Sequence, residues 1–469
     1  MSDELCRMSA VDLLAAYDTG ELSPVQVTEA VLARIHDLND AYNAFCLIDD
    51  AGALASARAS EKRWRAGAPE GRIDGVPVSV KDLVLAEGWP TLRGSKTTSR
   101  DQPWDEDAPA VARLREHGGV LLGKTTTPEY GWKGVTDSPL TGITRNPWNV
   151  EHTPGGSSGG GAVAALCGMG PLHIGTDGGG SVRIPCSFSG IFGIKANFGR
   201  VPVYPASPFG SLSHLGPMTR TVADAALMLT VMAEPDTRDA YALPFDERDF
   251  GAVLEGGIAG MRVAFSSDLG YATVDAEVAE LVSEAAKSFS ALGAEVEQTG
   301  PGFDNPQEIF RAHWYAGAAF VLRAMTDEQR QLVDPGLRTV AERGEAITME
   351  AYMNATMART HLTTRMREFH QSYDLLLTPT MPLPAFSLGS DTPIGPDGSS
   401  WDDCSPFTYP FNLTGQPAAT VPCGFTSAGL PVGLQIVGRH YDEASVLRAA
   451  YAFEAANPQH RKTPEFTAA

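Results

Sequence analysis

The chain has 469 residues, which is enough for a large core, and its length alone favours two or three domains. Hydrophobic residues make up 43% of it and charged residues 20%, as in ordinary globular proteins. The formal net charge is −21, because 57 acidic residues outnumber 36 basic ones. This charge argues against nucleic acid or an anionic membrane as the main partner.

The cysteine pattern and the first residues indicate a reducing compartment. Six cysteines lie far apart and form no C-x-x-C pair, so we expect free, buried thiols. The opening MSDELCRMSA lacks the basic and apolar regions of a secretory signal. No apolar run approaches the roughly 18 residues that span a bilayer. We therefore expect a cytoplasmic protein without a membrane partner.

The first part of the chain predicts helices followed by a strand. Two amphipathic helices are expected within the first 40 residues, the second capped by Ser23 with Pro24 at its first position. Residues 73–83 then alternate valines with polar residues, which is typical of a strand with one apolar face. Lys81 projects from the face opposite the valines. Taken alone, this pattern favours a surface position for Lys81, beside Asp82.

Strands and helices then alternate along the chain, which predicts an α/β fold without internal repeats. A proline-, aspartate- and glycine-rich segment at 234–260 is the best candidate boundary, and 389–403 has the composition of an exposed loop. Helices are expected at 108–117, 162–167, within 216–233, at 275–292, on to about 372, and from Asp442 to about 456. Strands are expected at 119–123, 171–175, 261–265, 294–297, 375–378, 419–422 and 433–437, while 191–195 is apolar and 125–148 is a polar, aromatic loop.

The segment 155–183 (GGSSGGGAVAALCGMGPLHIGTDGGGSVR) carries two glycine-dense loops with serines. Such loops direct backbone N–H groups at an anion, and the adjacent serines suggest acyl transfer. Residues 155–159 also satisfy G-x-S-x-G, but the polar NVEHTP before them is no strand. Residues 159–164 fit G-x-G-x-x-A, again without a preceding strand. Glycine loops without any chemistry are the remaining alternative.

Several spaced motifs together resemble the amidase signature family. The resemblance runs to about residue 240 and resumes from about 373, leaving a variable part between. The motifs are 75–82 (GVPVSVKD), 155–160 (GGSSGG), 175–185 (GTDGGGSVRIP), 190–195 (GIFGIK), 216–220 (GPMTR) and 430–435 (LPVGLQ).

This resemblance implies one large α/β domain over residues 1–469, with a mixed central β-sheet covered by helices on both faces. Within it we expect N-terminal helices at about 8–70 and a signature core at about 71–233. A variable substrate-side region at about 260–372 and C-terminal strands with a helix at about 373–457 would follow. The family's enzymes need no metal and no organic cofactor.

The resemblance also implies a Ser–cis-Ser–Lys catalytic set. Ser181 would be the nucleophile, Ser157 the bridging serine after a cis peptide bond to Gly156, and Lys81 the base. Burial disfavours an ammonium group and leaves a neutral amine that accepts a proton at neutral pH. Backbone N–H groups of Gly178, Gly179, Gly180 and Ser181 would form the oxyanion hole. The residues expected to support this set are Ser158, Asp177 and Arg183.

Two positions depart from the family pattern. Gly178 stands where threonine or isoleucine is more common, so we expect a looser loop or a roomier pocket there. Gly161 stands where serine or glutamate is common. Neither departure touches the three expected catalytic positions.

The resulting hypothesis is a hydrolase of small amides, with aryl amides, anilides or carbamates (urethanes) as candidate substrates. We expect a monomer or homodimer that acts on a small molecule. One alternative is the catalytic A subunit of a glutamyl/aspartyl-tRNA amidotransferase, but Ser405 stands where that branch has an acidic residue, seven positions before Asn412. A non-catalytic binding protein of the same fold is the other alternative. Aromatic pocket candidates are Tyr130, Trp132, Phe209, Trp314 and Phe407.

Overall fold

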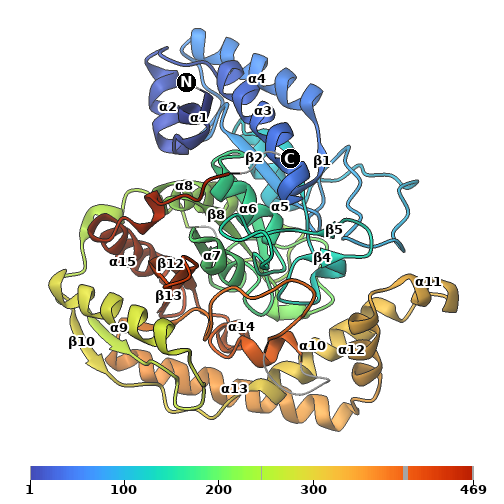
Figure 1. The fold of residues 1–469 in the computed structure, drawn as a ribbon, viewed down its shortest axis with the longest axis vertical. Helices are drawn as coiled ribbons and strands as arrows, with labels where there is room; N and C mark the ends of the chain where they lie inside the picture. The colour runs from blue at the N-terminus through green and yellow to red at the C-terminus, as the bar shows by residue number, and fades with distance from the viewer. Residues whose placement is uncertain (1, 245, 394–399, 467–469) are drawn as a thin grey trace.

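Eleven strands form one continuous sheet in a computed structural model that describes residues 2–244, 246–393 and 400–466 (Figure 1). The strand order is β1-β3-β2-β6-β8-β7-β12-β13-β11-β9-β10. The strands are β1 (Phe45–Ile48), β2 (Pro77–Lys81), β3 (Val120–Thr125), β6 (Leu172–Asp177), β7 (Phe192–Lys195), β8 (His214–Thr219), β9 (Arg262–Phe265), β10 (Glu295–Gln298), β11 (Leu375–Pro379), β12 (Ala418–Phe425) and β13 (Pro431–Gly438). A separate short hairpin joins β4 (Asp137–Ser138) to β5 (Gly142–Ile143).

The helices gather around this sheet, with the N-terminal four at one end of the molecule and α13 at the other (Figure 1). They are α1 (Ser2–Arg7), α2 (Ala10–Asp18), α3 (Pro24–Tyr42), α4 (Asp50–Arg65), α5 (Pro109–Glu116), α6 (Gly159–Cys167), α7 (Arg183–Ser189), α8 (Val222–Met232), α9 (Ala276–Ala291), α10 (Gln307–Leu322), α11 (Asp327–Leu332), α12 (Pro335–Glu345), α13 (Met349–Ser372), α14 (Tyr409–Thr414) and α15 (Glu443–Ala456). The predicted cap of α3 is present, because the Ser23 hydroxyl accepts the N–H of Gln26.

The sheet mixes parallel and antiparallel strands. β2 lies between β3 and β6 and is parallel to both, whereas β6 pairs antiparallel with β8. The C-terminal hairpin of β12 and β13 then joins β7 on one side to β11 on the other. Segment 234–260 is therefore a crossing between two parts of one sheet.

Helices cover both faces of the sheet, and strand periodicity determines which side chains meet them. In β11, Leu375 and Leu377 pack into the core that contains residues of α8, α9 and α15, while Leu376 packs on the opposite face with Phe411 of α14. Successive side chains of a strand point to opposite faces. The predicted α/β architecture with helices on both faces is thus confirmed.

Three details differ from or extend the expectations. The predicted exposed loop 389–403 lies partly outside the described residues, and its last part is buried: Trp401 is only 2% exposed. Composition suggested exposure, but the aromatic ring fills a core position. All six cysteines are free, five of them buried and Cys46 exposed. Within the described ranges, no helix combines the length and apolarity needed to cross a membrane.

Candidate active site

Lys81 ends strand β2 and is fully buried, contrary to the surface position that its strand pattern alone favours. The valines of β2 face one core, and α6 covers the other face, so the opposite side of the strand is also shielded. The Lys81 Nζ is within hydrogen-bond distance of three hydroxyls: Ser157 Oγ at 2.7 Å, Ser158 Oγ at 2.8 Å and Thr176 Oγ1 at 2.8 Å.

The electrostatic setting of Lys81 favours the neutral amine. Burial holds the pKa of Lys81 well below its usual value, and the more distant charge of Asp177 opposes this shift only in part. Among the residues described by the structure, no carboxylate oxygen lies within 4 Å of its Nζ. An ammonium group at this position would lose its hydration without gaining an ion pair, which is unfavourable in a protein interior.

The first glycine loop brings Ser157 to the amine. The Gly156–Ser157 peptide bond is cis, as the family resemblance implied. A β-carbon on Gly156 would lie 2.6 Å from the backbone carbonyl of Val135, so only glycine fits there. Ser157 lines the cavity described below and also accepts the bond from Lys81, whereas Lys81 itself does not line that cavity.

The second glycine loop follows strand β6 and presents Ser181 to the cavity. The N–H of Ser158 donates to the carbonyl of Ser181 at 3.2 Å, which ties the two loops together. Gly180 has φ of 131°, and its N–H donates to Asp177 Oδ1 at 2.8 Å. This N–H is therefore not free for an oxyanion. In the described part of the chain, the N–H groups of Gly178, Gly179 and Ser181 have no protein acceptor.

Aromatic rings occupy the space where Gly178 and Gly179 lack side chains. A β-carbon on Gly178 would lie 2.8 Å from Trp314 Cζ3, and one on Gly179 would lie 2.7 Å from Trp401 Cη2. The Trp314 ring also stacks on Phe209, with centroids 4.0 Å apart. The sequence suggested a roomier pocket at Gly178. The pocket is not roomier there, because the Trp314 ring fills the volume that a side chain would occupy.

Asp177 and Arg183 form a fully buried ion pair that holds the second loop in shape. Arg183 Nη2 lies 2.9 Å from Asp177 Oδ1, and its guanidinium also donates to Asn412 Oδ1, Gln435 Oε1 and the carbonyl of Thr408. Burial alone would raise the pKa of Asp177, but the Arg183 charge and hydrogen bonds lower it below its ordinary value. The carboxylate thus stays ionised and fixes the N–H groups of the loop around it.

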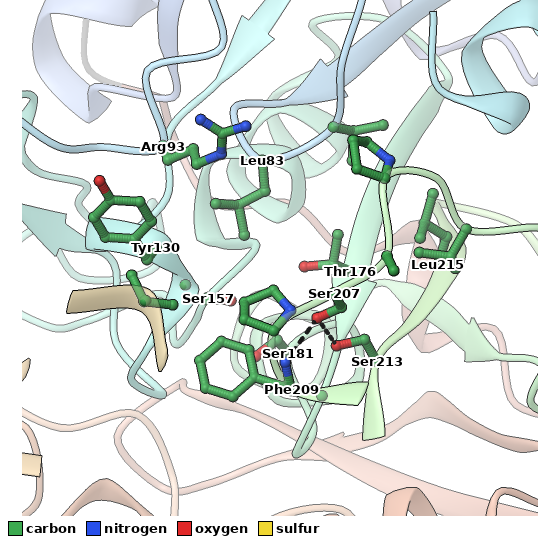
Figure 2. A pocket seen from close by; sticks show the side chains of 18 of the residues that line it. Leu83, Arg93, Tyr130, Ser157, Thr176, Ser181, Ser207, Phe209, Ser213 and Leu215 are labelled. Atoms are coloured by element: carbon green, nitrogen blue, oxygen red, sulfur yellow. Dashed lines mark hydrogen bonds between the residues drawn. The ribbon is translucent and has the colours of Figure 1, made fainter. Parts of the chain in front are cut away.

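A cavity of about 480 Å³ opens in front of the two serines. Figure 2 shows Ser157, Thr176 and Ser181 on its wall with Tyr130 and Phe209. Of the five aromatic pocket candidates, Tyr130, Phe209 and Trp314 line it. Trp132 and Phe407 do not. The Trp132 ring packs among core residues of α10 and α12, and Phe407 packs beneath the sheet beside Leu376 and Val437.

Several functional contacts escape inspection of the sequence. Thr176 sits inside a recognised motif, but only the alternation of β6 places its hydroxyl beside Lys81. Gln435 also lies in a recognised motif, yet no spacing relates it or Asn412 to Arg183, more than 220 residues away. Their amide side chains within apolar strands or helices are the only local signal, because buried amides require partners.

The fold and this site define a hydrolase that acts on the carbon–nitrogen bonds of amides. The chain belongs to the amidase family, whose model, described as Amidase, matches residues 26–447. An acylamidase of Rhodococcus erythropolis is 38% identical over 463 residues, 97% of either chain. The A subunit of the glutamyl-tRNA(Gln) amidotransferase of Myxococcus xanthus is 36% identical, covering 96% of this chain and 97% of its own.

Solved structures of amidase signature enzymes superpose over nearly the whole chain. A bacterial aryl acylamidase of this family has a TM-score of 0.90 at 30% identity, with 96% of each chain covered. A 6-aminohexanoate cyclic dimer hydrolase has a TM-score of 0.89 at 27% identity, covering 98% of this chain and 99% of its own. The overall fold is thus shared with these enzymes.

Proposed function

We propose that the protein hydrolyses small amides through an acyl-enzyme formed on Ser181, with Ser157 and Lys81 as the proton relay. The neutral amine of Lys81 accepts the proton of Ser157, and Ser157 accepts that of Ser181 as the Ser181 Oγ attacks the substrate carbonyl. The proton then returns through Ser157 to the leaving nitrogen, and the C–N bond breaks. Water releases the acyl group from Ser181 by the same relay.

One observation carries this proposal: Ser157 lines the same cavity as Ser181 and is hydrogen-bonded to the buried amine of Lys81, which does not itself line that cavity. A proton that leaves the cavity for Lys81 therefore passes through one of the two hydroxyls that line the cavity and bond the amine, Ser157 or Thr176, and the proposed relay uses Ser157. Burial supports the neutral amine that the relay requires.

The free N–H groups of the second loop support an oxyanion hole of three donors, from Gly178, Gly179 and Ser181. Donors fixed before the reaction stabilise the developing negative charge, and one such donor typically contributes about 3–4 kcal/mol. The Asp177 carboxylate accepts the N–H groups of Gly180 and Val182, the two neighbours of Ser181 in the chain, and so fixes the loop. The loop thus needs no rearrangement as the charge develops.

Apolar cavity walls support an aryl amide, an anilide or an aryl carbamate as substrate. The stacked rings of Phe209 and Trp314 offer a flat surface on which an aromatic group would pack. The relatives named acylamidase and aryl acylamidase favour the same class. A cytoplasmic location and a monomeric or dimeric state complete this proposal.

The amidotransferase alternative is disfavoured by the cavity itself. Its substrate, glutamine, carries an ammonium group that requires an acidic partner, and no aspartate or glutamate lines the described cavity. Ser405 is buried away from the cavity, with its hydroxyl donating to the carbonyl of Trp401. Glutamine-dependent ammonia release in the presence of partner subunits would establish the alternative.

A fluorophosphonate probe with peptide mass spectrometry tests the nucleophile. We expect covalent label on Ser181, and we expect Ser181→Ala to lower kcat/KM by at least 1,000-fold on a panel of anilides, amides and carbamates. Ser290→Ala, on the exposed face of α9, is the matched control and should retain full activity. Label elsewhere together with an active Ser181→Ala variant would overturn the proposal.

A further inference from the structure

The cavity has the opposite charge character from the rest of the chain. The whole sequence is strongly acidic, with a net charge of −21. The described residues that line the cavity nevertheless include two arginines, Arg93 and Arg323, and no aspartate or glutamate. A cation in a largely apolar cavity interacts more strongly with a bound anion than it would in water.

The backbone of Arg93 is held from three sides. Asp82 Oδ1 accepts the N–H of Leu92 at 3.0 Å, and Asp82 Oδ2 accepts the N–H of Gly94 at 3.1 Å. The carbonyl of Arg93 accepts the N–H of Tyr130 at 2.8 Å. Asp82 directly follows Lys81, so the turn that carries Arg93 is anchored to the end of β2.

Arg93 and Tyr130 share an unusual backbone conformation. Both have left-handed φ angles, 58° and 52°, which few residues other than glycine adopt, and both line the cavity. Non-glycine residues in such conformations gather at binding and active sites. The backbone that carries Arg93 is therefore fixed at the wall of the cavity.

The Arg93 guanidinium has no hydrogen-bond or ion-pair partner within the described residues. None of its nitrogens donates to a protein acceptor, and no carboxylate lies within 4 Å. Arg323 differs, because it is exposed and donates to the carbonyl of Phe320. Figure 2 shows Arg93 beside Leu83 and Tyr130 at the edge of the site that holds Ser157 and Ser181.

We propose that Arg93 selects substrates that carry a carboxylate remote from the amide to be cleaved. This inference rests on the proposed amide hydrolysis and specifies its substrate class. The planar guanidinium binds a carboxylate through two parallel hydrogen bonds, and the apolar walls accommodate the hydrocarbon between the carboxylate and the amide. The substrate thus supplies the negative charge that the cavity lining lacks, and Arg93 pairs with it.

Matched substrate pairs test this inference. In the first pair, the anionic partner is a 4-nitroanilide with a terminal carboxylate on its acyl chain. In the second pair, the anionic partner carries the carboxylate on the amine part of the amide. In each pair, the neutral partner has a methyl ketone in place of the carboxylate. The readout is the ratio of kcat/KM for the anionic and neutral partners, at low ionic strength, in the wild type and in Arg93→Gln, Arg93→Lys and Arg58→Gln.

We expect the wild type to prefer the carboxylate partner in at least one pair. Arg93→Gln should lower kcat/KM for that partner at least tenfold and change the neutral partner less than twofold. Arg93→Lys should retain part of the preference, because it keeps the charge but not the bidentate geometry. Arg58→Gln removes a charge from the exposed face of α4 and should retain the full preference.

The two proposals fail in distinguishable ways. Equal losses for anionic and neutral partners in Arg93→Gln, or no carboxylate preference in either pair, would overturn the role of Arg93. Turnover of the neutral substrates that depends on Ser181 would still support the proposed hydrolase. Absence of any turnover by the wild type, together with an unlabelled Ser181, would instead overturn the hydrolase itself.

Discussion

The atoms that contact the amine of Lys81 carry no formal charge. Three hydroxyls surround its amine, and no carboxylate within the described ranges reaches it. A hydroxyl that accepts a hydrogen bond stabilises the ammonium less than a carboxylate does. Burial therefore dominates and favours the neutral amine that the proposed relay requires.

The pH dependence of activity follows from this balance. Because the relay needs neutral Lys81, kcat/KM should rise with pH along a limb that reports the lowered pKa of Lys81. Thr176→Val removes one acceptor of nearly the same shape, which disfavours the ammonium, so the limb should move to lower pH. Rate profiles from pH 4 to 10 measure this shift. A limb that moves to higher pH in the variant would contradict the role of Lys81.

Gly178 and Trp314 should behave as a coupled pair. Gly178→Ala places a β-carbon 2.8 Å from the Trp314 ring, so the ring or the loop must move and kcat/KM should fall at least tenfold. Trp314→Phe has a smaller ring and should recover a large part of this loss in the double variant. A double-mutant cycle on kcat/KM measures the coupling. Additive effects of the two changes would show that the ring does not limit residue 178.

At the scale of single residues, the sequence predicts which residues form the site better than it predicts what packs around them. The structure brings the motif residues together, as the family resemblance implied. Lys81 is hydrogen-bonded to Ser157, and the loop of Ser157 is hydrogen-bonded to Ser181 through Ser158. The burial of Lys81 and the ring above Gly178 depend on packing by segments that lie far away in the chain. Strand alternation gives the direction of a side chain but not what covers it.

Helix α6 shows how neighbouring glycines of one element differ in function. A β-carbon on Gly160 would lie 2.5 Å from the backbone oxygen of Ala44 and from the N atom of Thr126. Around Gly161 the nearest atom to such a β-carbon is Met218 Sδ at 3.6 Å, an ordinary contact. Gly160 thus permits close packing of the helix, whereas Gly161 does not need to be glycine.

Alanine substitutions should separate these two glycines. Gly161→Ala should raise the free energy of unfolding by about 0.5–1 kcal/mol, because glycine lowers helix stability. Gly160→Ala should lower it by about 1–3 kcal/mol through overpacking. Thermal unfolding followed by circular dichroism gives both values relative to the wild type. Equal destabilisation by the two changes would contradict the packing at Gly161.

Elements with strong local signals were predictable, and those held by tertiary contacts were not. The valine alternation of β2 and the Ser23–Pro24 start of α3 both correspond to elements of the structure. Residues 401–403 end the segment 389–403, which was expected to be exposed because of its composition. Trp401 nevertheless packs edge-on against Phe310 of α10, with centroids 5.8 Å apart, and this contact has no local sequence signal.

At the scale of the whole molecule, Arg183 connects the reactive loops to the C-terminal part of the sheet. Its acceptors Asn412 and Gln435 belong to α14 and β13, while Asp177 ends β6. All four side chains are buried. A buried ion pair is weak evidence for net stability, but removal of one partner leaves a buried charge without compensation.

Arg183→Met should therefore destabilise the protein by about 3–5 kcal/mol. Without the guanidinium, burial raises the pKa of Asp177, so protonation of this carboxyl as pH falls removes the buried charge, and the stability difference between variant and wild type should narrow at acid pH. The stability that the wild-type pair contributes is present above the unfolded pKa of about 3.9 and is lost as pH falls. Unfolding at a series of pH values measures both effects. Arg65→Met, at an exposed pair with Glu61, is the control and should cost less than about 1 kcal/mol.

The overall α/β class was predictable from alternating strands and helices, but the strand order was not. The composition change at 234–260 suggested a boundary, yet β12 pairs with β7 across it. Hairpins and βαβ units are local in the chain, whereas this pairing joins segments more than 200 residues apart. Local patterns contain no information on such a distant partner.

The long reach of Arg183 has a consequence for synthesis of the chain. Lys81, Ser157 and Ser181 all leave the ribosome early, but the acceptors of Arg183 follow it by 225, 229 and 252 residues. A nascent or truncated chain that stops before Thr408 holds both serines and the lysine without the contacts that shape the second loop. A chain cut short before Thr408 should therefore show no hydrolytic activity, even though it contains Lys81, Ser157 and Ser181.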